Sequence, residues 1–393
     1  MQHSQEFFEV LWSQWEKKLP FVAYTDLGAN EENVKALLQT DLKINKVSDF
    51  SESGFVFAPF DNSRQIILFP ANSSREITTV FNKGEDIPGK HKNIEDTAET
   101  PDEKEAHLKL VQKGIDAIKS GNLEKVVLSR TEMLHLEDHN AIAIFKRLLK
   151  KYPTAFVYIW FHPKIGLWLG ATPETLLQVE RNRLKTMALA GTKKYSGEDE
   201  VEWGQKEMEE QQIVTDIILE ELQKTCINLE TNGPYTTRAG NLFHLRTDIN
   251  GEINGDIKYP GTDAMHRVSK GDIKNLIYSI HPTPAICGHP IEEARKFILE
   301  NENYDREYYT GFLGELNMKK KLQRSSNKRN RENLAYSSIV NQTALYVNLR
   351  CMKIEATTAT LYVGGGITAD SDPEAEWEET QNKAGTMKAV LLN

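Results

Sequence analysis

The spacing of apolar residues along the chain predicts strands separated by turns. Short apolar runs bounded by turn residues are typical of strands, and they occur at 54–57, 65–69, 125–128, 155–161, 165–170, 176–179 and 184–189. His162-Pro163-Lys164 and Arg181-Asn182 between neighbouring runs indicate antiparallel hairpins. In the last third, two further runs at 346–353 and 360–363 lead to Gly364-Gly365-Gly366.

Between these strands, apolar residues three or four positions apart predict helices. Thr100-Pro101-Asp102-Glu103 is a capping box with proline at the first helical position, so a helix begins there and runs towards Gly121. Shorter helices are predicted around 273–280 and after Pro290, and a closing helix runs from Asp372-Pro373 towards Val390. One long helix has an apolar face made of Ile213, Val214, Ile217, Ile218 and Leu222.

This order of elements predicts an α+β fold with two antiparallel sheets flanked by helices. Because no repeat period and no Pro- or Ser-rich linker interrupts the chain, we expect one domain over residues 1–393. Within it we separate an N-terminal part at 1–100 from a core at 101–393. The acidic stretch 83–99 is predicted to be a mobile surface loop. The basic stretch 319–331 has no apolar period, which favours a solvated loop over a polyanion site.

Composition narrows the class of protein. At 393 residues and 39% hydrophobic, the chain can bury the core of an enzyme. The segment after Met1 lacks the basic and apolar regions of a leader, and no stretch approaches the roughly 20 apolar residues of a membrane helix, so we expect a cytoplasmic protein. A net charge of -9 argues against a nucleic-acid partner. Three distant cysteines, Cys226, Cys287 and Cys351, suggest buried thiols and neither a disulfide framework nor a zinc site.

Two predicted helices carry stripes of carboxylates. In the closing helix, Glu376, Glu379 and Lys383 project from one side, since they are three and seven positions apart. A surface salt bridge explains this stripe alone. The long helix carries a second stripe with Glu207, Glu209, Glu210 and Asp216, for which simple solvation is the alternative. Because Mg²⁺ takes one or two protein carboxylates together with waters and substrate oxygens, one Glu from each helix could form a shared site.

Lys125 and Glu174 are candidates for acid–base chemistry. Lys125 opens an apolar strand, where burial would favour the neutral amine that a base requires. A strand-end lysine that extends to water is the alternative. Glu174 follows an apolar strand at a turn marked by Pro173, where burial would keep it protonated as a general acid. An ordinary turn carboxylate is the alternative.

Two glycine-containing segments and one histidine are further candidates. Gly191-Thr192 and Gly365-Gly366 follow strands, where the backbone N–H groups of glycine-rich chain can approach an anion, but neither has a nucleotide-binding fingerprint. His281 follows an apolar helical run, and such a histidine is more often the partner of a helix C-terminus than a ligand.

Taken in order, these segments resemble the chorismate-utilising enzymes, which include isochorismate synthase, salicylate synthase and the large subunits of anthranilate and aminodeoxychorismate synthase. The resemblance covers roughly residue 103 to the C-terminus, and it implies the anthranilate synthase component I fold. Its motifs are KVVLSR at 125, GATPE at 170, LAGT at 189, KEMEEQQIV at 206, HPTPAICG at 281, REYYTG at 306, NLRC at 348, GGGI at 364 and EETQNK at 378.

The resemblance implies a set of site residues. Glu210 and Glu379 would bind Mg²⁺, which holds the ring carboxylate of chorismate, with Glu207 and Glu376 nearby. The enolpyruvyl carboxylate would be held by Tyr309, Arg350, Lys383, Gly365 and Gly366. The ring would lie against Gly191, Thr192 and His281. The family usually has Asp-x-x-Glu-His where this chain has Glu207-x-x-Glu210-Gln211, so Glu209 is an alternative to Glu210 as ligand.

Lys125 separates the branches of this family. Members that use ammonia resemble this motif but carry Gln there, because ammonia needs no base, whereas members that add water carry Lys. The resemblance therefore implies isochorismate formation for menaquinone or catecholate siderophore biosynthesis, with Lys125 as base, Glu174 as acid, and no obligatory glutaminase subunit. Salicylate synthase, which goes on to eliminate pyruvate, shares these residues and is the alternative.

Overall fold

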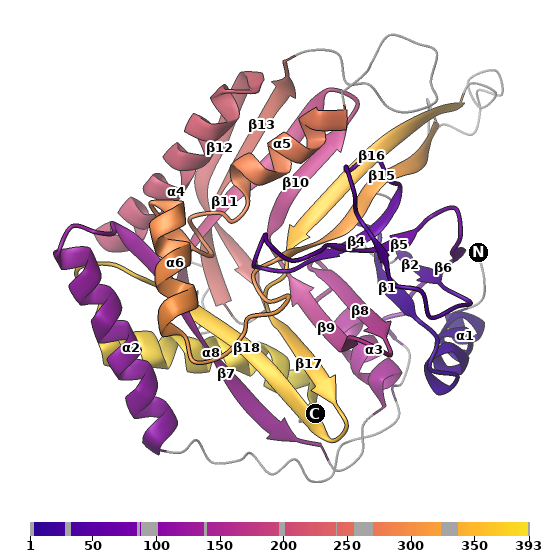
Figure 1. Cartoon of the computed structure of the whole chain (residues 1–393), viewed down its shortest axis with the longest axis horizontal. Helices are drawn as coiled ribbons and strands as arrows, with labels where there is room; N and C mark the ends of the chain where they lie inside the picture. The colour runs from indigo at the N-terminus through magenta and orange to yellow at the C-terminus, as the bar shows by residue number, and fades with distance from the viewer. Residues whose placement is uncertain are drawn as a thin grey trace.

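Among the residues that the structure describes, two nine-stranded antiparallel sheets pack against each other in the computed structural model (Figure 1). The first sheet contains, in order, β14 (Gly288–His289), β7 (Lys125–His135), β18 (Thr358–Ile367), β17 (Cys351–Glu355), β9 (Gly166–Thr172), β8 (Phe156–His162), β1 (Phe21–Thr25), β2 (Asn33–Leu38) and β6 (Arg75–Val80). The second contains β12 (Cys226–Ala239), β13 (Leu242–Ile253), β11 (Arg183–Lys194), β10 (Thr175–Glu180), β16 (Ser337–Val347), β15 (Phe312–Gln323), β4 (Gly54–Ala58), β5 (Ile67–Pro70) and β3 (Asn45–Lys46). The structure describes residues 4–27, 33–84, 87, 101–136, 140–195, 201–240, 242–254, 270–323 and 337–391.

Aromatic side chains fill the space between the two sheets. Phe156 of β8 stacks on Tyr346 of β16 with ring centres 4.0 Å apart, and Phe57 of β4 lies 5.0 Å from Trp160 of β8. These rings are buried with others from both sheets in one cluster. Large aromatic side chains gain the most from such burial, so this layer holds the sheets together.

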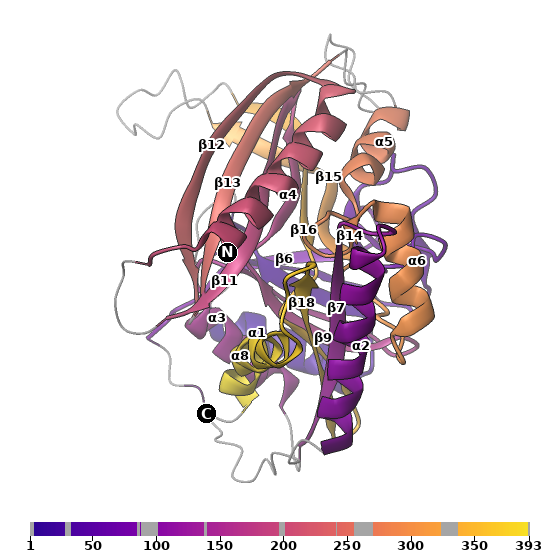
Figure 2. The same cartoon turned by 90° about the vertical axis from the view of Figure 1, so that its left-hand side faces the viewer.

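Helices cover the outer faces of both sheets (Figures 1 and 2). The outer face of the first sheet packs against α1 (Ser4–Glu16), α3 (Ala141–Lys151) and α8 (Pro373–Leu391). The second sheet is covered by α4 (Gln205–Gln223) and α5 (Lys270–Ile280). The β7 end of the first sheet packs against α2 (Pro101–Lys119) and α6 (Ile291–Asn301), as Figure 2 shows. The predicted α+β class with two antiparallel sheets is confirmed.

Strand pairing brings the three glycines beside the start of β7. The glycines lie within β18, where Gly366 pairs with Val127, Gly365 with Leu128 and Gly364 with Ser129. The register places the glycine backbone next to the strand that Lys125 opens. The strand predicted before these glycines was therefore too short, because β18 continues through them to Ile367.

Three predictions of local structure were wrong. The run 346–353 is two strands, because Asn348-Leu349-Arg350 carry the chain from β16 in the second sheet to β17 in the first. Ile213 is 39% exposed, whereas Val214 is buried, so the apolar face of α4 is narrower than predicted. Residues 319–323 continue β15 and are not a loop.

Some predictions lie partly or wholly outside the described residues. They are Thr100 of the capping box, 85–86 and 88–99 of the acidic stretch, and 324–331 of the basic stretch. Within the described residues, α2 begins at Pro101 as predicted. The three cysteines are free and buried, also as predicted. None of the described helices is long and apolar enough to span a membrane.

Candidate active site

A cavity of about 150 Å³ lies where β18 and β11 meet α4 and α8. β18 belongs to the first sheet and β11 to the second. β11 and α4 come from the middle of the sequence, whereas β18 and α8 come from its C-terminal part, and Figure 2 shows α4 beside β11 and α8 beside β18. Most of the predicted site residues line this cavity: Glu174, Gly191, Thr192, Glu207, Glu210, Tyr309, Arg350, Gly365, Gly366, Glu376, Glu379 and Lys383.

Lys125 does not line this cavity but is buried against two residues that do, Glu210 and Gly366, and it does not extend to water. Its residue is 2% exposed, and its Nζ donates to Glu210 Oε1 at 2.7 Å. A Cβ at Gly366 would lie 2.8 Å from that oxygen and 3.0 Å from Lys125 Cε. A side chain at position 366 would therefore push the Glu210 carboxylate or the Lys125 side chain out of its present place.

Glu174 is a buried acid at the same cavity. It is 3% exposed, and desolvation raises its pKa to about 8, although the positive charges of Arg350, Lys125 and Lys383 oppose the shift. The carboxyl is therefore mostly protonated at neutral pH, as a proton donor must be. Lys125 forms its ion pair with Glu210 and not with Glu174. An ion pair with Glu174 would keep the lysine protonated and the acid ionised, which is the wrong protonation state for each role.

The two carboxylate stripes meet at the cavity, one from α4 and one from α8. Glu379 Oε1 accepts from Lys383 Nζ at 2.6 Å, which is the salt bridge expected within one helix. Glu376 is buried and accepts from Ser371 Oγ at 2.6 Å. Glu209 lies outside the site, where its carboxylate accepts from Gln205 at 2.7 Å in an exposed position. Of the two alternatives on α4, it is Glu210 that faces the cavity.

These carboxylates fit a hard divalent cation. Glu210 and Glu379 each already hold a lysine ammonium, so both positions are suited to positive charge. No group of three or more acidic, histidine or cysteine side chains converges on one point within the described ranges. Mg²⁺ needs only one or two protein carboxylates because substrate and water supply its other oxygens. Glu210 and Glu379, with Glu207 and Glu376 beside them, could hold such an ion.

Other residues that line the cavity can donate hydrogen bonds to an anion. Arg350 Nη1 donates to Ala239 O at 3.0 Å, and burial lowers the pKa of this guanidinium to about 10, so it remains a cation at neutral pH. Lys383 Nζ also donates to Gly364 O at 2.8 Å. Burial raises the pKa of Tyr309, so its hydroxyl stays a neutral donor. A carboxylate is the complementary ligand.

His244 of β13 belongs to this site and was missed by the sequence analysis. Its Nδ1 lies 2.9 Å from Gly191 O, a carbonyl that can only accept, so Nδ1 carries the proton and Nε2 accepts from Arg350 Nη2. Burial and the Arg350 charge lower the pKa of His244 well below its ordinary value, so the ring is neutral. A lone histidine in the apolar run Leu242–Leu245 gave only a weak signal of this role.

His281 does not line the cavity, unlike the other residues predicted to contact the ring. It follows α5, is 2% exposed, and its Nε2 lies 3.1 Å from Thr310 O. Thr310 itself lines the cavity. His281 therefore contacts a residue of the cavity wall but does not face the cavity itself.

Comparison with known proteins connects this geometry to a family. The chain is 28% identical over 314 residues to isochorismate synthase MenF of Escherichia coli, an alignment that covers 78% of this chain and 64% of the relative. It is 27% identical over 300 residues to isochorismate synthase DhbC of Bacillus subtilis, covering 72% and 66%. The chain thus matches just under two thirds of the length of these relatives.

Solved structures show the same fold. Menaquinone-specific isochorismate synthase MenF of Escherichia coli superposes with a TM-score of 0.72 at 23% identity, covering 95% of this chain and 88% of that one. Anthranilate synthase component I of Streptococcus pneumoniae gives 0.60 at 16% identity, covering 93% and 89%. Sequence profiles described as chorismate binding enzyme match residues 56–322 and 335–389. The chain belongs to the chorismate binding enzyme family.

Proposed function

We propose that this protein is an isochorismate synthase that adds water to chorismate in a Mg²⁺-dependent reaction, for menaquinone or catecholate siderophore biosynthesis. The observation that carries the proposal is that the buried acid Glu174 lines the same cavity as Glu210, whose carboxylate accepts a hydrogen bond from the buried Lys125. Glu174 can give a proton, and Lys125 can take one after it loses the proton of the ammonium that pairs with Glu210. Addition of water with loss of a hydroxyl requires both.

The reaction consists of one bond made and one bond broken. The oxygen of water attacks C2 of chorismate while Lys125 Nζ, neutral when it acts, takes a proton from that water. The double bonds of the ring shift, and the C4–O bond breaks as Glu174 gives its proton to the departing hydroxyl. One water enters and one leaves, so substrate and product are isomers. Each acid–base role typically contributes about 10²- to 10⁴-fold.

The carboxylates and the donor groups place the substrate between acid and base. Mg²⁺ on Glu210 and Glu379, with Glu207 and Glu376 nearby, would neutralise and orient the ring carboxylate. Because Glu210 Oε1 accepts from the Lys125 ammonium, a cation bound to that same oxygen would compete with Lys125 for it. Tyr309, Arg350, Lys383 and the Gly365–Gly366 backbone would hold the enolpyruvyl carboxylate.

Product analysis tests the proposal. The protein is incubated with chorismate, with Mg²⁺ or with a chelator, in the absence of any other enzyme or ammonia, and the products are separated by chromatography. We expect isochorismate only when Mg²⁺ is present. Release of fluorescent salicylate would instead support salicylate synthase, and unchanged chorismate under both conditions would reject both activities.

A further inference from the structure

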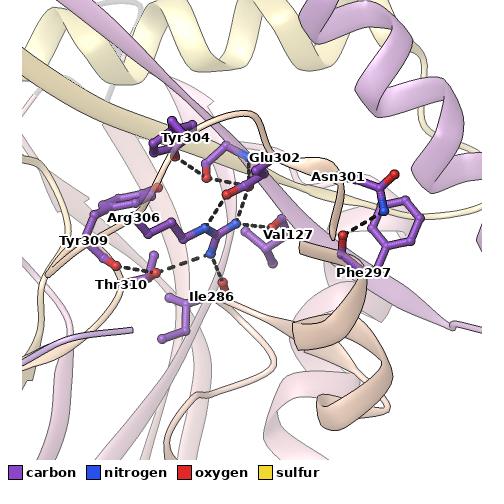
Figure 3. Close-up of polar contacts among 10 residues, drawn as sticks. Val127, Ile286, Phe297, Asn301, Glu302, Tyr304, Arg306, Tyr309 and Thr310 are labelled. Carbon is purple, nitrogen blue, oxygen red and sulfur yellow. Dashed lines mark hydrogen bonds and ion pairs between the residues drawn. The ribbon is translucent and has the colours of Figure 1, made fainter. Parts of the chain in front are cut away.

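Arg306 lies behind the cavity with every N–H of its guanidinium bonded to an oxygen (Figure 3). Its side chain is 3% exposed. Nε and Nη2 donate to the two oxygens of Glu302 at 2.7 and 2.6 Å. Nη2 also donates to Val127 O at 2.7 Å, and Nη1 donates to Ile286 O at 3.2 Å and to Thr310 Oγ1 at 3.3 Å. A guanidinium has five N–H groups in a rigid fork, and all five are used here.

Glu302 fixes the other side of this group. The two residues form a bidentate ion pair, in which the Glu302 side chain is 2% exposed. Glu302 Oε1 also accepts from the backbone N–H and the hydroxyl of Ser129 at 2.8 and 2.7 Å. Ser129 lies on β7, so these hydrogen bonds connect the ion pair to the strand that begins at Lys125. The charge of Arg306 is neutralised here and is not directed at a ligand.

The three remaining acceptors of Arg306 belong to three separate walls of the cavity. Val127 is on β7, two residues after Lys125, Ile286 is in the segment before β14, and Thr310 follows Tyr309. All three line the cavity. One buried side chain therefore fixes the relative position of three segments that are distant in the sequence.

Thr310 needs this support because its backbone is strained. Its φ is 59°, in the left-handed region that a β-branched residue rarely adopts. Such a conformation persists only where the surroundings hold it. Here Thr310 N donates to Asn348 O at 2.9 Å, His281 Nε2 lies 3.1 Å from its carbonyl, and its hydroxyl accepts from Arg306 while donating to Tyr309 O at 2.6 Å.

We propose that Arg306, held by Glu302, is a positioning residue that sets the place of Tyr309 and Thr310 against the β7 wall. It does not touch substrate. The inference rests on the proposed function, since Tyr309 is expected to bind a carboxylate of chorismate. A displacement of about 1 Å at such a site can reduce turnover by about 10²-fold.

Arg306→Lys tests this role, because lysine keeps the charge beside Glu302 but cannot reach all of Val127, Ile286 and Thr310. Steady-state kinetics with saturating Mg²⁺ should show kcat/KM lower by about 100-fold, with KM for chorismate raised at least fivefold. Calorimetry of chorismate binding to the metal-loaded protein should show the same rise in Kd. Glu302→Gln, which keeps the shape and loses one of the two Arg306 contacts, should raise KM in the same direction.

Lys35→Met is the matched control. Lys35 also forms a partly buried ion pair, with Glu315 at 2.9 Å, but neither residue lines the cavity. Loss of stability alone lowers the folded fraction and leaves KM unchanged, and this is what the control should show. Folded Arg306→Lys protein with KM and Kd within twofold of wild type would overturn the inference. If that variant does not fold, an unchanged KM in Glu302→Gln overturns it.

Failure of the proposed function is a separate outcome. Wild-type protein that neither binds nor converts chorismate would reject the proposed function, and this inference with it. Wild-type protein that converts chorismate, together with kinetically normal Arg306 and Glu302 variants, would reject the inference alone.

Discussion

The substitution Glu174→Gln should change how the stability of the protein depends on pH. In the folded chain the pKa of Glu174 is about 8, because the carboxyl is desolvated, whereas an exposed glutamate titrates near 4.5. Between these pH values the folded state binds a proton that the unfolded state has lost. The free energy of unfolding therefore falls as pH rises from 4.5 to 8 and is flat with respect to this group above 8.

The size of the effect follows from the two pKa values. At about 1.4 kcal/mol for each pH unit, the wild type loses about 5 kcal/mol over the whole interval and about 3 kcal/mol between pH 5.5 and 8. Gln cannot titrate, so the variant lacks this loss. Relative to wild type, Glu174→Gln should become more stable by about 3 kcal/mol on going from pH 5.5 to pH 8.

Urea denaturation of both proteins in metal-free buffer at these two pH values measures the difference. Comparing the proteins at each pH cancels the contributions of other titrating groups. An equal stability difference at pH 5.5 and pH 8 would show that Glu174 is ionised in the folded chain, which would refute its assignment as a protonated acid. In activity, kcat/KM of the wild type should fall as pH rises through about 8, and Glu174→Gln should lower kcat by about 10²- to 10⁴-fold.

Four further substitutions, one of them a control, test the remaining roles. Lys125→Gln should lower water addition by at least about 10²-fold while chorismate still binds in calorimetry, and near-wild-type turnover would contradict its role as base. Glu210→Gln should weaken Mg²⁺ binding measured by calorimetry, whereas the neighbouring Glu209→Gln should not, and equal effects would contradict the choice between them. His244→Phe removes the acceptor of Arg350, so KM for chorismate should rise about tenfold, from the roughly 1.5 kcal/mol of a hydrogen bond to a charged group; an unchanged KM would contradict this.

Local sequence patterns predicted the elements whose burial is regular. The start of α2 could be predicted from the proline at its first position, and β8 and β9 could be predicted from their apolar runs, because these signals lie within the elements themselves. The strand β12 was missed because nearly all of its residues are exposed or half-buried, so it has no alternation of apolar and polar positions. The break at Asn348–Arg350 was missed because the chain changes sheets there, and a crossing between sheets leaves no periodic signal.

A residue's position in its own element supplied only candidates for the site, and the resemblance to the chorismate-utilising enzymes supplied the roles and added Tyr309 and Arg350. Lys125 at the start of a strand and the stripes on α4 and α8 were such candidates. The contact between Lys125 and Glu210 could not, since it depends on the register of β18 against β7 and on the missing side chain of Gly366. The role of His244 depends on Gly191, 53 residues away in the sequence. Arg306 has close partners at Glu302 and Thr310, but its contact with Val127 spans 179 residues, so local spacing did not show that it joins separate segments of the cavity wall.

The central claim is that this chain directs water to C2 of chorismate, and isotope incorporation tests it most directly. Chorismate and Mg²⁺ are incubated with the protein in ¹⁸O-labelled water, without any other enzyme, and the products are examined by mass spectrometry. The account predicts isochorismate that carries one ¹⁸O, located at C2, and no such product from Lys125→Gln. Isochorismate without label, or no conversion of chorismate by the wild type, would contradict it.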